Sequence, residues 1–226
     1  MSFIEQKARD ITRPMLESVA RTLAKWKVSP NAITYLGLVL TLGVAVLVAL
    51  GELRWAGVAY IVASASDAMD GTLARVSGKG SRFGAFLDST IDRFEESLVF
   101  LGLIFYYAQT GSELEVTLTL LVTVGSLMVS YTRARAEGLG ISCKVGFMTR
   151  IPRVAILIAA LILNQVLIAL IILAVTTLWT TGHRMVHAWK MTGGEAGGWA
   201  PPKDIFISPG LLDEEDKGDE AAEIEA

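Results

Sequence analysis

The chain has 226 residues, of which 52% are hydrophobic and 19% are charged, whereas soluble domains contain about 45–50% apolar and about 25% charged residues. Ten of the 23 acidic residues lie after position 190, against two of the 20 lysines and arginines, so the net charge of −3 hides a basic body and an acidic tail. This composition argues against a soluble globular protein. The single cysteine, Cys143, excludes an intramolecular disulfide.

Residues 1–30 are expected to form an amphipathic segment at the membrane surface. Apolar residues recur there at helical spacing, and Lys and Arg residues occupy the other faces. Pro14 indicates that a new helix begins at that point rather than that one helix runs through the whole segment. A solvated arm is the alternative interpretation.

Six apolar segments follow, and a bilayer core of about 30 Å needs about 20 helical residues, or fewer where the ends are polar and buried in protein. We therefore predict an all-α integral membrane domain over residues 31–191 with six transmembrane helices. The expected helices lie at 31–51, 55–75, 83–108 and 115–137, followed by one that ends near Asn164 and one that continues to about Lys190.

Basic residues gather in alternate connections of this series. The N-terminal segment, the connections at 76–82 and 138–150 and the segment after 182 are rich in Lys and Arg, whereas the other connections contain only Arg54. Because cytoplasmic loops carry an excess of Lys and Arg, we predict a multi-pass protein of the cell membrane with both termini in the cytoplasm. Residues 192–226 are rich in Gly, Pro and acidic residues and are expected to form a disordered cytoplasmic tail.

Four aspartates lie within the second and third predicted helices, where ionisable groups are costly and indicate a functional site. Asp67 and Asp70 share a face of one helix, and Asp88 and Asp92 share a face of the next. Counted from the connecting loop, both pairs lie at a similar depth near the cytoplasmic side. Without His or Cys nearby, these hard oxygens favour Mg²⁺ or Mn²⁺, and four carboxylates can hold two such ions.

Small and basic residues accompany the aspartates. Gly71 lets a ligand approach the backbone, and Arg75 offers a guanidinium to phosphate oxygens. Together the residues read Asp67-x2-Asp70-Gly71-x2-Ala74-Arg75-x8-Gly84-x3-Asp88-x3-Asp92. This pattern resembles the signature of the CDP-alcohol phosphotransferase family at every fixed position and gap. The resemblance covers about residues 10–190.

The resemblance implies an enzyme that moves a phosphatidyl or archaetidyl group from a CDP-lipid to the hydroxyl of a polar acceptor and releases CMP. The four aspartates would hold two divalent ions, Mg²⁺ or Mn²⁺, and Asp92 would also act as the general base. The residues implied to contact the CDP-lipid are Pro30, Asn31, Ala32, Ile33, Gly71, Ala74, Arg75, Ser81 and Gly84. The resemblance also implies a homodimer with its active site facing the cytoplasm, and we expect no nucleic-acid partner.

A cluster of cations at the end of the fourth predicted helix and in the loop after it indicates that the acceptor itself carries phosphate. This segment is similar to the prokaryotic branch of the family that makes phosphatidylinositol phosphate or archaetidylinositol phosphate, so inositol phosphate is the expected acceptor. Within this likeness, Arg133, Arg150 and Arg153 are the expected ligands of the acceptor's phosphate.

Other interpretations stay open. A basic cytoplasmic loop that only follows the positive-inside bias would explain the same arginines. Glycerol phosphate and serine are alternative acceptors, and a cation-coupled membrane transporter is the alternative from a different class. Glu95 and Glu96 follow Asp92 in the third helix, where Glu96 could orient a ligand or form an internal salt bridge.

Overall fold

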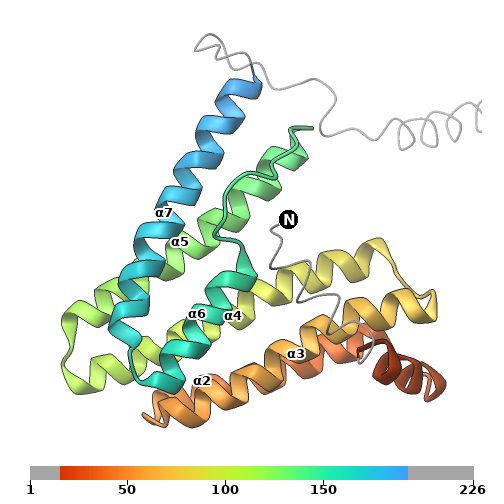
Figure 1. The fold of residues 1–226 in the computed structure, drawn as a ribbon, viewed down its shortest axis with the longest axis horizontal. Helices are drawn as coiled ribbons and strands as arrows, with labels where there is room; N and C mark the ends of the chain where they lie inside the picture. Colours follow the sequence, from red (N-terminus) through yellow and green to blue (C-terminus); the bar gives the residue numbers. More distant parts are fainter. Residues whose placement is uncertain (1–15, 193–226) are drawn as a thin grey trace, which may run out of the picture.

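The computed structural model describes residues 16–192 (Figure 1). A helix over residues 16–25 comes first. Six longer helices follow: α2 (Pro30–Ala49), α3 (Leu53–Ser77), α4 (Arg82–Thr110), α5 (Glu113–Gly138), α6 (Arg150–Leu163) and α7 (Val166–Met191). The described residues contain no strand. The all-helical prediction is therefore confirmed, and the expected bounds of the first four long helices agree with the observed ones within two residues.

The helix ends near the aspartates are defined by local capping. The Ser29 side chain caps the start of α2, with Pro30 in the first turn, where a missing N–H costs little. Ser81 caps α4 in the same way, because its hydroxyl accepts the N–H of Gly84 at 2.9 Å. Gly78 ends α3 in the left-handed conformation, with φ of 65°. The starts of α2 and α4 and the loop after α3 line one common pocket.

The helices pack as two connected groups. α2 contacts both α3 and α4, α5 contacts α7, and α6 joins the groups through α3 and α7. Figure 1 shows α2, α3 and α4 running alongside one another, while α5 and α7 rise together away from them. Small residues allow close approach: a Cβ added to Gly102 of α4 would lie 2.5 Å from the backbone oxygen of Ala45 in α2.

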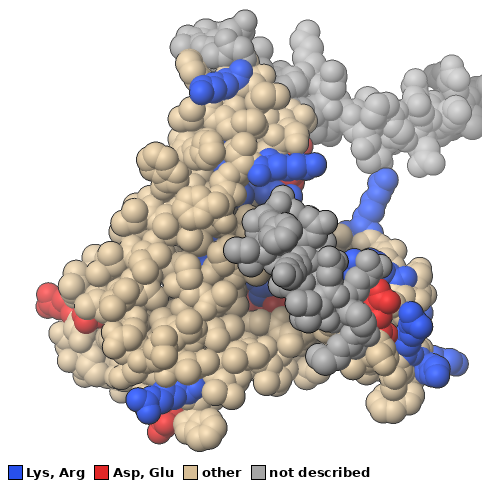
Figure 2. Space-filling view, in the orientation of Figure 1, with Lys and Arg blue, Asp and Glu red and all other residues tan. Residues whose placement is uncertain are grey.

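The larger of two apolar clusters in the described residues joins α2 to α7 and includes the fully buried side chains of Tyr60, Phe100, Leu157 and Leu170. Many large apolar side chains nevertheless stay exposed on the outer faces of the helices. Figure 2 shows charged side chains mostly toward the edges of the view and a largely uncharged face over α5, α6 and α7. A bundle with an apolar core and an apolar outer face suits a lipid environment.

Within the described residues, α2, α5 and α7 are long and apolar enough to cross a membrane. The other three long helices are not both long and apolar enough. α6 has only 14 residues, and α3 and α4 contain several charged residues, among them the four signature aspartates. The six-span count and the interfacial placement of the N-terminal segment therefore stay predictions. Residues 1–15 and the acidic tail over 193–226 lie outside the described residues.

The loop that precedes α6 is held in place by Arg184 of α7. Its Nε donates to the carbonyl of Val145 at 3.0 Å, and its Nη1 donates to the carbonyl of Val129 in α5. Arg184 is buried. These contacts fix the position of the loop that leads into α6, whose first residue is Arg150.

Candidate active site

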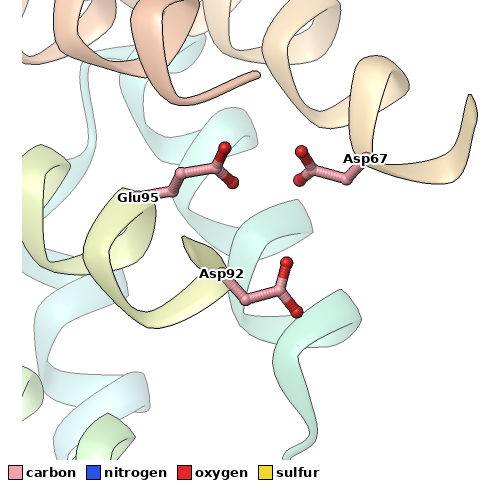
Figure 3. A group of neighbouring side chains, drawn as sticks. All are labelled: Asp67, Asp92 and Glu95. Atoms are coloured by element: carbon pink, nitrogen blue, oxygen red, sulfur yellow. The ribbon is translucent and has the colours of Figure 1, made fainter. Parts of the chain in front are cut away.

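Three carboxylates from two helices converge on one space. Asp67 comes from α3, whereas Asp92 and Glu95 come from successive turns of α4. Figure 3 shows their side chains directed toward a common space. One oxygen from each lies within 4.8 Å of the others. The structure thus brings Asp67 and Asp92 together as expected and adds Glu95, which the signature does not contain.

Glu95 is a buried acid with unused hydrogen-bonding capacity. Its side chain is 1% exposed, and its Oε1 has no hydrogen-bond partner in the described structure. Gly37 of α2 makes room for it, since a Cβ there would lie 2.9 Å from both Glu95 Oε1 and Asp67 Oδ1. A buried carboxylate oxygen requires a donor or a cation. The cluster consists of carboxylate oxygens only, and such a donor set fits a divalent cation.

Arg150 lies in contact with all three carboxylates. Its Nη1 is 2.6 Å from Asp92 Oδ1, and its Nη2 is 2.7 Å from both Asp67 Oδ2 and Glu95 Oε2. The guanidinium compensates part of the negative charge of the cluster. The structure thus places one of the three arginines expected at the acceptor directly beside two of the expected metal ligands.

The other two signature aspartates line an adjacent pocket of about 190 Å³. Asp70 is 5% exposed, and its Oδ2 accepts a hydrogen bond from Thr34 Oγ1 of α2 at 2.6 Å. Asp88 lies on α4, one turn before Asp92. The remaining lining residues are Pro30, Asn31, Thr34, Gly71, Ala74, Lys79, Gly80, Ser81, Gly84 and Ala85.

Six of the nine residues expected to contact the CDP-lipid line this pocket, and Ala32, Ile33 and Arg75 do not. Arg75 instead donates to the carbonyl of Gly71 and to the Thr72 hydroxyl of its own helix, both at 3.2 Å. Among the described residues, no heavy atom outside the local helix lies within 4 Å of a Cβ built on Gly71, so this wall of the pocket is open.

The remaining two arginines expected at the acceptor have carboxylate partners of their own. Arg153 is 1% exposed and pairs with Glu96 through two hydrogen bonds of 2.6 and 2.7 Å, while its Nη1 donates to the Met148 carbonyl at 3.0 Å. Arg133 pairs with Glu137 one turn along α5 at 2.8 Å and is half exposed. Glu96 thus forms an internal salt bridge, one of the two roles considered for it. The acceptor roles of the arginines stay predictions.

Sequence reasoning did not assign three residues that shape the site: Gly37, Thr34 and Glu95. Glu95 had a usable signal, because an acid one turn after Asp92 in an apolar helix shares its face. Gly37 and Thr34 had none, since their importance depends on how α2 packs against α3 and α4.

The fold and the site define a helical membrane protein with a carboxylate centre beside an open pocket. The family model for CDP-alcohol phosphatidyltransferases matches residues 27–182, and the chain belongs to this family of membrane enzymes.

Relatives with assigned activities are similar over most of their length. Archaetidylinositol phosphate synthase from Pyrococcus horikoshii is 35% identical over 185 residues, which cover 81% of this chain and 95% of the relative. Phosphatidylinositol phosphate synthase from Corynebacterium glutamicum is 34% identical over 185 residues, covering 78% and 84%.

Crystal structures of Mycobacterium tuberculosis phosphatidylinositol phosphate synthase share the fold. The structure with CDP-DAG bound has a TM-score of 0.74 at 27% identity and covers 86% of this chain and 98% of that one. The complex with manganese and citrate has a TM-score of 0.76 at 27% identity, with coverage of 85% and 100%.

Proposed function

We propose that this enzyme transfers the phosphatidyl or archaetidyl group of a CDP-lipid to a hydroxyl of inositol phosphate and releases CMP. The observation that carries the proposal is the carboxylate cluster of Asp67, Asp92 and Glu95 beside the pocket that Asp70 and Asp88 line. The activities of the relatives from P. horikoshii and C. glutamicum support inositol phosphate as the acceptor.

In this proposal the four signature aspartates hold two divalent ions, Mg²⁺ or Mn²⁺. The hard-oxygen donor set and the manganese complex of the M. tuberculosis relative support this cofactor. Such ions neutralise the diphosphate and stabilise the departing CMP. Side chains of the protein would bind the CDP group and take the proton of the acceptor hydroxyl.

The pocket beside Asp70 and Asp88 would take the CDP group. Gly80 and Ser81 bring the N-terminal end of α4 to its wall, and Lys79 adds a positive charge. A helix N-terminus and a lysine both favour phosphate oxygens. The CDP-DAG complex of the M. tuberculosis relative supports this assignment.

Asp92 would take the proton of the acceptor hydroxyl as the general base. The 2.6 Å contact between Arg150 Nη1 and Asp92 Oδ1 supports this role. A phosphate group bound by this guanidinium would bring the acceptor's hydroxyl close to the carboxylate that must deprotonate it.

The placement in the membrane completes the proposal. We expect six spans, a cytoplasmic active site and cytoplasmic termini, because Lys and Arg concentrate at the end of the chain's helices where the aspartates lie. The polar faces of α3 and α4 would then be turned to the site and shielded from lipid by α2 and α6. A homodimer, supported by the family likeness, is part of the same proposal.

The experiment that tests the acceptor is CMP release by the purified full chain in nanodiscs containing a CDP-lipid and Mg²⁺. Inositol phosphate, glycerol phosphate, inositol and serine are supplied separately, once with CDP-diacylglycerol and once with its ether-linked archaeal counterpart. We expect turnover with inositol phosphate only. Turnover with another acceptor would keep the chemistry and discard inositol phosphate, whereas no CMP with any pair would contradict the proposed CDP-lipid donors.

Replacing Thr34 with Val should lower turnover about tenfold, in line with the loss of one hydrogen bond to a charged group. The hydroxyl of Thr34 holds Asp70 at 2.6 Å in the pocket wall, and Val keeps the shape of the side chain without that donor. CMP release at saturating substrates measures the effect. Thr41→Val is the matched control, since Thr41 is equally buried on α2 but lies two turns farther from the pocket. An equal loss in both variants would contradict a specific role for Thr34.

A further inference from the structure

One carboxylate of the central cluster lies outside the four signature aspartates. Glu95 is the most buried partner of Arg150, with a side chain 1% exposed against 14% for Asp67 and 19% for Asp92. We infer that Glu95 is a positioning residue that keeps Arg150 in the site when divalent cations take Asp67 and Asp92. The inference rests on the proposed function in one respect, that these two aspartates hold cations.

Arg150 and a divalent cation compete for the same oxygen atoms. The guanidinium contacts Asp67 and Asp92 at 2.7 and 2.6 Å. A cation on these two carboxylates draws on the same lone pairs and repels the positive charge beside it. Of the three carboxylates in contact with Arg150, Glu95 is then the one that remains as its partner.

Each member of the Arg150–Glu95 pair has one buried polar atom that could form a further hydrogen bond. Arg150 Nε and Glu95 Oε1 lack hydrogen-bond partners in the described part of the chain. The neighbouring pair shows what such atoms do: Arg153 Nε donates to one oxygen of Glu96 at 2.6 Å and Nη2 donates to the other at 2.7 Å. Because Arg150 Nη2 already donates to Glu95 Oε2, a shift toward Glu95 would complete the same two-point pair.

This shift has a consequence for the acceptor. With Nε and Nη2 held by Glu95, Arg150 Nη1 is released from Asp92 and becomes available to a phosphate oxygen next to the proposed base. Glu95 would therefore set the position of Arg150 without touching either substrate.

Manganese binding by the full chain in nanodiscs, without lipid substrate or acceptor, tests the inference. Glu95→Gln should weaken Mn²⁺ binding about tenfold, within the coupling found in one ion-pair network, because Arg150 then keeps only Asp67 and Asp92 as charged partners. Arg150→Met should tighten binding. In the double variant Glu95→Gln/Arg150→Met, the weakening caused by the Glu95 substitution should disappear.

The alternatives give different results. Equal weakening by Glu95→Gln with and without Arg150 would make Glu95 a metal ligand and overturn the inference, and an unchanged Mn²⁺ affinity would overturn it as well. Failure of the unsubstituted chain to bind Mn²⁺ would overturn the proposed metal site together with the inference. Glu96→Gln is the matched control, because Glu96 pairs with Arg153 and not with Arg150. The Mn²⁺ affinity of this variant should stay within about twofold of that of the unsubstituted chain.

Kinetics supply a second readout that a merely structural role would not move. Glu95→Gln should raise KM for inositol phosphate while leaving KM for the CDP-lipid unchanged, whereas a rise in both would contradict the inference. If Glu95→Gln does not fold, Glu95→Asp carries the test, since its shorter carboxylate keeps the charge and should weaken Mn²⁺ binding only when Arg150 is present. Equal weakening without Arg150 would again overturn the inference.

Discussion

CMP release should fall at least about a thousandfold when Asp92 is replaced by Asn. General-base catalysis alone contributes about 10²- to 10⁴-fold, and Asn also removes the negative charge that a divalent cation needs at this position. The substitution keeps the size of the side chain, so the packing of α4 against Asp67 and Arg150 should change little. Steady-state CMP release with saturating CDP-lipid, inositol phosphate and Mg²⁺ measures the loss.

Two further measurements separate the two roles of Asp92. Mn²⁺ titration reports the ligand role, and KM for each substrate reports whether the rest of the site is intact. Glu113→Gln is the control, since Glu113 is exposed at the start of α5, at the opposite end of α4 from the aspartates, and should leave turnover unchanged. Retention of more than about a tenth of the turnover would rule out Asp92 as the base.

The helices were predictable because their ends carry local signals. Pro30, Gly78 and Gly111 stand at helix ends for reasons of backbone conformation, and the apolar runs between them match the observed α2, α3 and α4. A similar depth for the Asp67–Asp70 pair and the Asp88–Asp92 pair was predictable by counting residues along two antiparallel helices from the loop that joins them. The structure brings Asp67 of the first pair and Asp92 of the second together, which the count alone did not single out.

The contacts of the arginines were not predictable from local pattern. Arg150 is 83 residues from Asp67 in the chain, and their ion pair depends on how the loop before α6 is held against α5 and α7. Position in a basic loop indicated only that Arg150 and Arg153 face phosphate or lipid headgroups. That one of them meets two aspartates and the other is fully buried follows from tertiary packing alone.

The prediction of six spans depended on the length of the apolar segments. Among the described helices, three are long and apolar enough to cross a membrane. α6 has 14 residues, too few for a bilayer of full thickness unless its ends are supported by protein. Its two N-terminal arginines have carboxylate partners: Arg150 contacts the carboxylate cluster and Arg153 contacts Glu96. The charged start of this short helix is therefore held by ion pairs with carboxylates of α3 and α4.

Replacing Arg153 with Met should destabilise the protein by about 3–5 kcal/mol, because the substitution leaves the carboxylate of Glu96 buried without a cation. Glu96→Met should cost a similar amount for the reciprocal reason, since Arg153 is 1% exposed and has Glu96 as its carboxylate partner. In the double variant Arg153→Met/Glu96→Met both buried charges are gone, so most of the lost stability should return. Thermal unfolding in detergent, followed by circular dichroism, measures all three variants.

Kinetics of the stable double variant then test whether Arg153 also binds the acceptor's phosphate. If Arg153 also donates to the acceptor's phosphate, KM for inositol phosphate should stay at least about tenfold above its original value although the fold has recovered, since a hydrogen bond to a charged group is worth about 1.5–3 kcal/mol. KM for the CDP-lipid should not change, because Arg153 does not line the pocket beside Asp70 and Asp88. A return of the acceptor KM to its original value would contradict the acceptor role and leave Arg153 as the residue that joins α6 to α4.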